Sequence, residues 1–119
     1  MSTPIFQVKT VNLSLQAQSP NELIFQCNDV TGAPVDISSG YVGLVKCQSQ
    51  STPTRGTEIV LGGTVTYGST GKLTFVMTIA QTNAVPCSEA MPMILMLSND
   101  SFASYSIAAT GFLKNNQAI

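Results

Sequence analysis

The chain has 119 residues and a formal net charge of −1, from five Lys or Arg and six Asp or Glu. This length fits one domain, large enough to bury a core without a metal or a disulfide. The basic residues lie far apart in sequence, which argues against nucleic acid or an anionic membrane as a partner, because both favour clustered Lys and Arg. The chain has no histidine, the commonest general acid or base at neutral pH. We therefore expect no enzymatic activity and no catalytic residues.

No segment reaches the ~18 apolar residues needed to span a bilayer. Residues 1–5 also lack the basic and apolar regions of a signal peptide, so we expect synthesis in a cytoplasm. The odd number of cysteines and the lack of CxxC spacing favour reduced, half-buried core residues over a disulfide or a zinc site. These cysteines are Cys27, Cys47 and Cys87.

Two carboxylates flank a turn, Asp29 and Asp36. They could approach one another, but calcium needs more oxygen ligands than two isolated acids supply. Asp side chains commonly hydrogen-bond the backbone of turns, and we expect that role here. The sequence predicts no metal and no cofactor.

Apolar residues recur at every second position along most of the chain, which predicts half-buried strands. We expect a polar exposed loop at 48–56 and a single helical turn at 81–85. Seven to nine short strands, with turn signals every 8–12 residues, indicate an all-β antiparallel sandwich. In chain order the expected strands cover residues 11–17, 23–27, 35–37, 41–47, 57–61, 64–67, 73–79, 91–97 and 103–113.

The penultimate expected strand is apolar on both faces. Met91, Met93 and Leu95 fall on one face, and Ile94 and Met96 fall on the other. A strand covered on both faces lies at the centre of a sheet or beneath a partner. Flexible methionine side chains suit either place, and we expect Met96 to face a neighbouring molecule.

Three stretches carry turn and strand patterns of one known family. Residues 25–40 contain D-V-T-G-A-P-V-D-I-S-S-G between two strands, and residues 71–78 read G-K-L-T-F-V-M-T, followed by Thr82 and Pro86. Residues 105–113 form a closing strand with a late glycine. Together these stretches resemble the small immunoglobulin-like domain at the N-terminus of the upper baseplate protein of lactococcal-type phages. Related domains occur in phage tail, neck and fibre proteins.

This resemblance implies an immunoglobulin-like sandwich and a structural role in a phage particle. The chain departs from the family pattern at two places. Ala90-Met91-Pro92 replaces the usual aromatic residue before the penultimate strand, and the extra Ser39 lengthens a turn. Family members often continue into fibre or receptor-binding domains, so a chain that stops at Ile119 favours a stand-alone structural subunit.

We expect an N-terminal arm at residues 1–10, an immunoglobulin-like sandwich at 11–113 and a C-terminal tail at 114–119. The leading hypothesis is a non-enzymatic virion protein of a tail, baseplate, neck or capsid surface. Its partners would be other virion proteins and copies of itself, and its arms would dock along sheet edges of neighbouring subunits. The interface residues predicted by this hypothesis are Pro4, Ile5, Phe6, Val8, Met96, Lys114 and Ile119.

An alternative hypothesis is a module that binds a carbohydrate or a host surface. Such a site presents exposed aromatic residues or converging polar groups. It would form here if Tyr67 and the loop 48–56 met on one face. The chain has no Trp and only three Tyr, which argues against this alternative.

Overall fold

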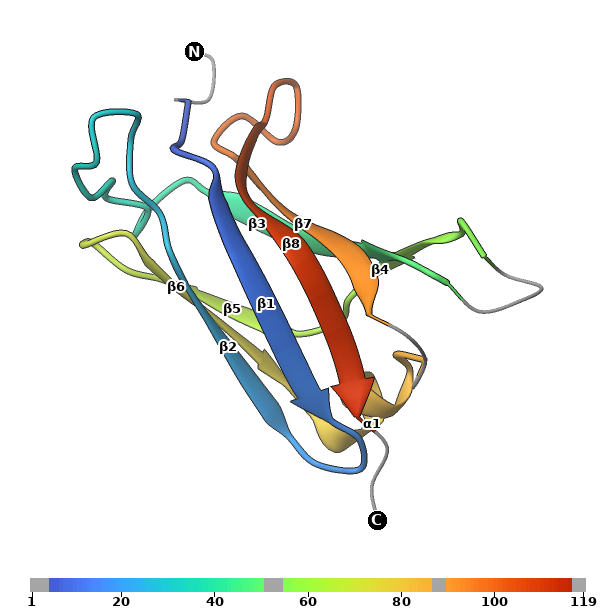
Figure 1. The fold of residues 1–119 in the computed structure, drawn as a ribbon. Coiled ribbons are helices and arrows are strands. Elements are labelled where there is room, and N and C mark those ends of the chain that lie inside the picture. The colour runs from blue at the N-terminus through green and yellow to red at the C-terminus, as the bar shows by residue number, and fades with distance from the viewer. Residues whose placement is uncertain (1–4, 51–54, 87–89, 117–119) are drawn as a thin grey trace.

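The computed structural model describes residues 5–50, 55–86 and 90–116. Within these ranges the chain forms eight strands and one short helix, arranged as two sheets packed face to face (Figure 1). The five-stranded sheet has the order β1-β8-β7-β3-β4, and the three-stranded sheet has the order β2-β6-β5. The elements are β1 (Lys9–Gln16), β2 (Asn21–Gln26), β3 (Val42–Gln48), β4 (Glu58–Val60), β5 (Thr64–Tyr67), β6 (Lys72–Met77), α1 (Ile79–Asn83), β7 (Met91–Ser98) and β8 (Ser106–Asn116).

The structure confirms the predicted all-β, immunoglobulin-like sandwich. Strands β2, β6 and β5 form one layer, and β8, β7, β3 and β4 lie together in the other, which is the strand partition of an immunoglobulin-like domain of variable type. One pairing differs from the antiparallel expectation, because β1 pairs with β8 in parallel. Parallel strands need a long crossover between them, and here the rest of the domain provides it.

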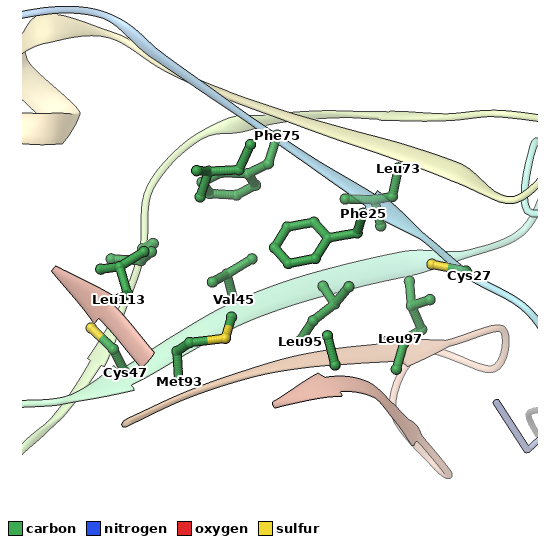
Figure 2. Packing of buried hydrophobic residues seen from close by; sticks show 14 of the residues in the cluster. Phe25, Cys27, Val45, Cys47, Leu73, Phe75, Met93, Leu95, Leu97 and Leu113 are labelled. Carbon is green, nitrogen blue, oxygen red and sulfur yellow. The ribbon is translucent and has the colours of Figure 1, made fainter. Parts of the chain in front are cut away.

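The core lies between the two sheets. Phe25, Leu73 and Phe75 point inward from the three-stranded sheet, toward Val45 and Leu95 of the five-stranded sheet (Figure 2). These side chains alternate along their strands with outward-facing residues, as a period of two requires. The apolar alternation in the sequence therefore marks the core correctly.

Cys27 and Cys47 are free and buried in this core. Burial raises the pKa of each thiol to about 11, because a thiolate would lose its hydration, although the charge of Lys9 opposes the shift at Cys27. Both thiols therefore stay protonated and pack as small apolar groups. The prediction of reduced core cysteines is confirmed for these two, and Cys87 lies outside the described residues.

Strand β8 has two irregularities that position its side chains. A bulge shifts its register against β7, so that Leu95 pairs with Ala109 while Met96 pairs with Ile107. Gly111 has φ +149°, and a Cβ atom there would lie 1.7 Å from the carbonyl oxygen of Val11. Glycine at this position is what allows β1 to approach β8.

A short helix closes one end of the sandwich. Thr78 caps α1 by accepting a hydrogen bond from the backbone of Gln81, whose side chain accepts one from the backbone of Thr78 in return. The cap ends β6 before Ile79, so the strand is shorter than the predicted range 73–79, and Ile79 is 49% exposed. From β8, the buried amide of Asn115 donates to the carbonyls of Thr82 and Val85.

Two expected strands also differ from the sequence prediction. Residues 35–37 form no strand, and the backbone N–H of Val35 donates instead to the carbonyl of Cys27 within a loop. Residues 103–105 belong to the turn that precedes β8.

The terminal arms predicted at 1–10 and 114–119 include residues that belong to the folded domain. Phe6 is 2% exposed, packs edge-on against Tyr41 and donates its N–H to Ser106 Oγ. Lys9 and Thr10 already belong to β1, and residues 114–116 pair with β1 as the end of β8. Aromatic burial and ladder hydrogen bonds thus hold these residues in the domain.

Candidate functional site

The outer face of the five-stranded sheet carries a group of apolar side chains, with Thr110 and Lys46 on either side of Ile94. Inward side chains of its strands fill the core, so the alternate side chains point away from it. On four neighbouring strands many of these outward residues are apolar. We call the following eight residues the outer apolar face: Val42, Leu44, Val60, Pro92, Ile94, Met96, Ile107 and Phe112.

Members of the outer apolar face lie beside one another across the strands. Phe112 of β8 pairs with Pro92 of β7, and Met96 of β7 pairs with Leu44 of β3 on one side and Ile107 of β8 on the other. Phe112 is 51% exposed, whereas Met96, enclosed by its two neighbours, is only 8% exposed. The centre of this face, at Met96, is thus packed by its neighbours, and the Phe112 ring is exposed at its margin.

Polar side chains border the outer apolar face. On one side β1 presents the outward residues Thr10, Asn12, Ser14 and Gln16. Lys46 lies within the face, between Ile94 and Val60, and its Nζ lies 3.1 Å from Glu58 Oε1. The Glu58 side chain at the edge remains 63% exposed. Apolar residues bordered by polar ones are the usual composition of a protein interface.

A pocket opens between β4, β3 and β7 at the edge of this face. Its volume is about 200 Å³, below the ~300–1,000 Å³ of typical small-molecule sites, so it has room for about one side chain. Pro92 and Ile94 supply apolar walls, while Lys46 and Glu58 supply charged ones. The complete lining is Lys46, Cys47, Gln48, Glu58, Pro92, Met93 and Ile94.

The loop carboxylates have structural partners. The Thr31 hydroxyl and then the Ala33 backbone N–H donate to Asp29 and hold its pKa below the usual range. Hydrogen bonds from Ser38 lower the pKa of Asp36 in the same way. These contacts confirm the turn role expected for both residues. Among the described residues, no cluster of His, Cys, Asp or Glu could hold a metal ion.

The predicted interface residues separate into three groups. Ile5 and Val8 are exposed, as is Lys114 on the same side of β8 as Phe112, and their contact role stays a prediction. Phe6 is a core residue, so its assignment to an interface is wrong. Met96 belongs to the outer apolar face, but side chains of its own domain leave it only 8% exposed, and its contact role stays a prediction. Pro4 and Ile119 lie outside the described residues.

Tyr67 lies away from the described ends of the loop 48–56, on which the carbohydrate-binding alternative depends. The Tyr67 hydroxyl accepts a hydrogen bond of 2.7 Å from the backbone N–H of Gly43, at the start of β3. The loop 48–56 begins at the other end of that strand, about 16 Å away at ~3.3 Å per residue. Residues 51–54 lie outside the described residues, and the carbohydrate-binding role stays a prediction.

Sequence reasoning missed Phe112 and the pocket residues. The alternation could have identified Phe112, because it is next to Leu113 in the same strand. Leu113 points into the core, so Phe112 points outward. The pocket had no comparable signal. It depends on β4 pairing with β3 while β7 lies on the other side, which requires the sheet order.

No helix in the described part of the chain is long and apolar enough to cross a membrane. No protein-family model matches the sequence, and no curated protein matches it. Among solved structures, the chain is similar to the extracellular domain of the voltage-gated sodium channel β4 subunit, whose parallel homodimers are described as explaining its role in cell-cell adhesion. The similarity has 15% identity and a TM-score of 0.46, and covers 99% of this chain and 100% of that one. A likeness at this level bears on neither function nor partners.

Proposed function

We propose that the chain is a non-enzymatic structural subunit of a phage virion, which assembles with other virion proteins through the outer face of its five-stranded sheet. The observation that carries this proposal is the outer apolar face, where Phe112, Pro92 and Ile94 lie side by side next to a pocket. Contiguous exposed apolar surface of this kind is typical of a contact with another protein. The sequence resemblance to a phage baseplate domain supports the particle as the setting.

The low charge of the surface supports the same role. A net charge of −1 leaves little electrostatic repulsion between neighbouring subunits. The described loop acids are held ionised by turn hydrogen bonds rather than set up as proton donors, which favours a structural role over catalysis. The sheet face replaces the terminal arms as the proposed contact, because Phe6 and residues 114–116 are built into the domain.

The proposal is tested on particles purified from the phage that encodes the chain. We expect mass spectrometry to detect it at a fixed ratio to the major capsid protein, and gold-labelled antibodies to decorate one location on the particle. A chain found only in the infected-cell lysate, and absent from purified particles, would overturn the proposal.

A matched pair of variants connects incorporation to the surface. Ile94→Asp places a charge in the outer apolar face, and Val76→Asp places one on the outer face of the other sheet, where Val76 is 40% exposed. In cells that supply the variants during infection, we expect Ile94→Asp to be excluded from particles and Val76→Asp to be incorporated. Equal incorporation of both would remove the outer apolar face from the proposal.

A further inference from the structure

We infer that the occupant of the outer apolar face is a second copy of this chain, packed face to face about a two-fold axis parallel to β7, with Phe112 of each copy in the pocket of the other. This inference rests on the proposed structural role and names the partner and the contact. It follows from the order of the strands, the fit of Phe112 to the pocket, the charges at the edge of the face and the area of the face.

The strand order makes the face self-complementary. The central strand β7 has β8 on one side and β3 on the other. When two such sheets face one another across a two-fold axis parallel to β7, β8 of each copy lies over β3 of the other. Phe112 pairs with Pro92, and Gln48 pairs with Glu58. The antiparallel pair Cys47–Met93 places Gln48 beside Pro92, so one row across the sheet is Phe112, Pro92, Gln48 and Glu58. Phe112 therefore faces Gln48 of the second copy, which lines the pocket.

The knob and the pocket have matching size and character. Phe112 is 51% exposed, and its ring stands next to the pocket of its own chain without lining it. The pocket of about 200 Å³ takes one side chain, and its walls at Pro92 and Ile94 are apolar. Aromatic rings that enter such pockets provide a large share of the binding energy of protein interfaces.

The charges at the rim are complementary in this arrangement. Lys114 lies two residues beyond Phe112 on the outer side of β8, one row from it. When Phe112 reaches the pocket, Lys114 comes to lie near Glu58 of the second copy. The Glu58 side chain contacts Lys46 of its own chain but is 63% exposed, so it can accept a second cation. The symmetry forms this contact twice.

The area of the face sets the strength of the contact. Within the face, strands β8, β7 and β3 contribute about 23–26 Å each, and the three-residue β4 contributes about 10 Å. At ~4.8 Å spacing these lengths give roughly 400 Å² per copy, or about 800 Å² in total. This area is in the range of weak, transient interfaces. We therefore expect a dimer with a dissociation constant in the upper micromolar range rather than a permanent one.

Sedimentation equilibrium of the full chain, from about 1 µM to about 500 µM, tests the inference. We expect a monomer–dimer equilibrium whose dissociation constant rises at least tenfold in Phe112→Ser. The matched control is Ile24→Ser on the outer face of the three-stranded sheet, because Ile24 is also 51% exposed, and we expect a change of less than twofold. Circular dichroism checks that both variants are folded. A monomer at every concentration, or a dimer insensitive to Phe112→Ser, would overturn the inference.

Chemical crosslinking tests the geometry directly. Facing residues of two packed sheets lie about 10 Å apart, too far for a disulfide but within reach of a bis-maleimide of similar span. In a Cys87→Ser background, a mixture of the single variants Phe112→Cys and Gln48→Cys should form a covalent dimer with this reagent. The control mixture of Ile24→Cys and Gln48→Cys should stay monomeric. Failure of crosslinking overturns this dimer, whereas the proposed structural role fails only if the chain is absent from purified particles.

Discussion

The outer faces of the two sheets carry apolar side chains in different arrangements. On the five-stranded sheet several of them are cross-strand neighbours, as Phe112 pairs with Pro92 and Met96 pairs with Leu44. Ile94 is the exception on this face, because it lies between Lys46 and Thr110. On the three-stranded sheet the exposed Ile24 has a polar cross-strand partner in Thr74. Val76 likewise pairs with Glu22 and Thr64.

This difference shows that clustering, more than apolar content, marks a contact surface. Single exposed apolar side chains occur on every soluble protein and need no partner. Exposed apolar neighbours can be covered together by one partner, and Phe112 at 51% exposure has the most apolar area to bury, whereas Met96 at 8% is already covered by its own domain. The five-stranded face is therefore suited to association, and the three-stranded face is suited to solvent.

The strongest way to break the five-stranded face is to remove its edge strand. Gly111→Ala places a Cβ atom 1.7 Å from the Val11 carbonyl oxygen, at a φ of +149° that side chains rarely adopt. We expect the free energy of unfolding to fall by more than about 3 kcal/mol, or the chain to fail to fold. Urea denaturation followed by circular dichroism measures the loss.

Gly62→Ala is the control for this change, since the nearest atoms to an added Cβ there belong to the Gln81 side chain, at an ordinary contact distance of 3.5 Å. We expect its free energy of unfolding to stay within about 0.5 kcal/mol of the wild type. Similar losses in the two variants would show that the approach of β1 to β8 does not depend on glycine.

A second change compares the two faces directly. Met96→Ala removes a nearly buried side chain from the five-stranded face and should cost about 2 kcal/mol of unfolding free energy. Val76→Ala removes a 40% exposed side chain from the three-stranded face and should cost less than about 1 kcal/mol. Denaturation at low protein concentration separates this effect from association. Equal costs would mean that the outer apolar face has no packed centre.

The strands and the core could be predicted from the sequence because they depend on local alternation. The period of two in residues 73–77 places Leu73, Phe75 and Met77 on one face, and all three are buried. The helical turn predicted at 81–85 forms two residues earlier, as α1 (Ile79–Asn83), because the capping box at Thr78 ends β6 before the alternation suggests.

The remaining features depend on contacts between distant residues. Phe6 is buried because Tyr41 and Ser106 lie beside it, and no local pattern reports those neighbours. The bulge that turns Ile107 toward Met96 results from the register of β7 against β8. Of the candidate site, only Ile94, Met96 and Lys114 could be predicted from the sequence. Phe112 and the pocket follow from the order of the strands.

The mildest test leaves both faces intact and changes the loop that joins β7 to β8. The Asp100 carboxylate accepts hydrogen bonds from the Ser104 hydroxyl and backbone N–H, and from the Ser98 hydroxyl, which lower its pKa to about 2. In the unfolded chain the pKa of an Asp is about 3.9. The stabilisation is therefore complete above pH ~4 and disappears as the pH falls toward 2.

We expect Asp100→Asn to lower the melting temperature at pH 7, with a difference from wild type that shrinks between pH 4 and pH 2. Asp29 and Asp36 also have lowered pKa values, so both proteins should still lose stability in acid. Ser101→Gly alters the same loop without a titrating group, at a φ of 57° that glycine adopts freely, and its effect should not depend on pH. If the difference in melting temperature between Asp100→Asn and wild type did not change with pH, the effect would come from the shape of the loop and not from the charge of Asp100. A shrinking difference, with association of the outer apolar face unchanged at pH 7, would show that the loop holds β7 and β8 together without taking part in the contact.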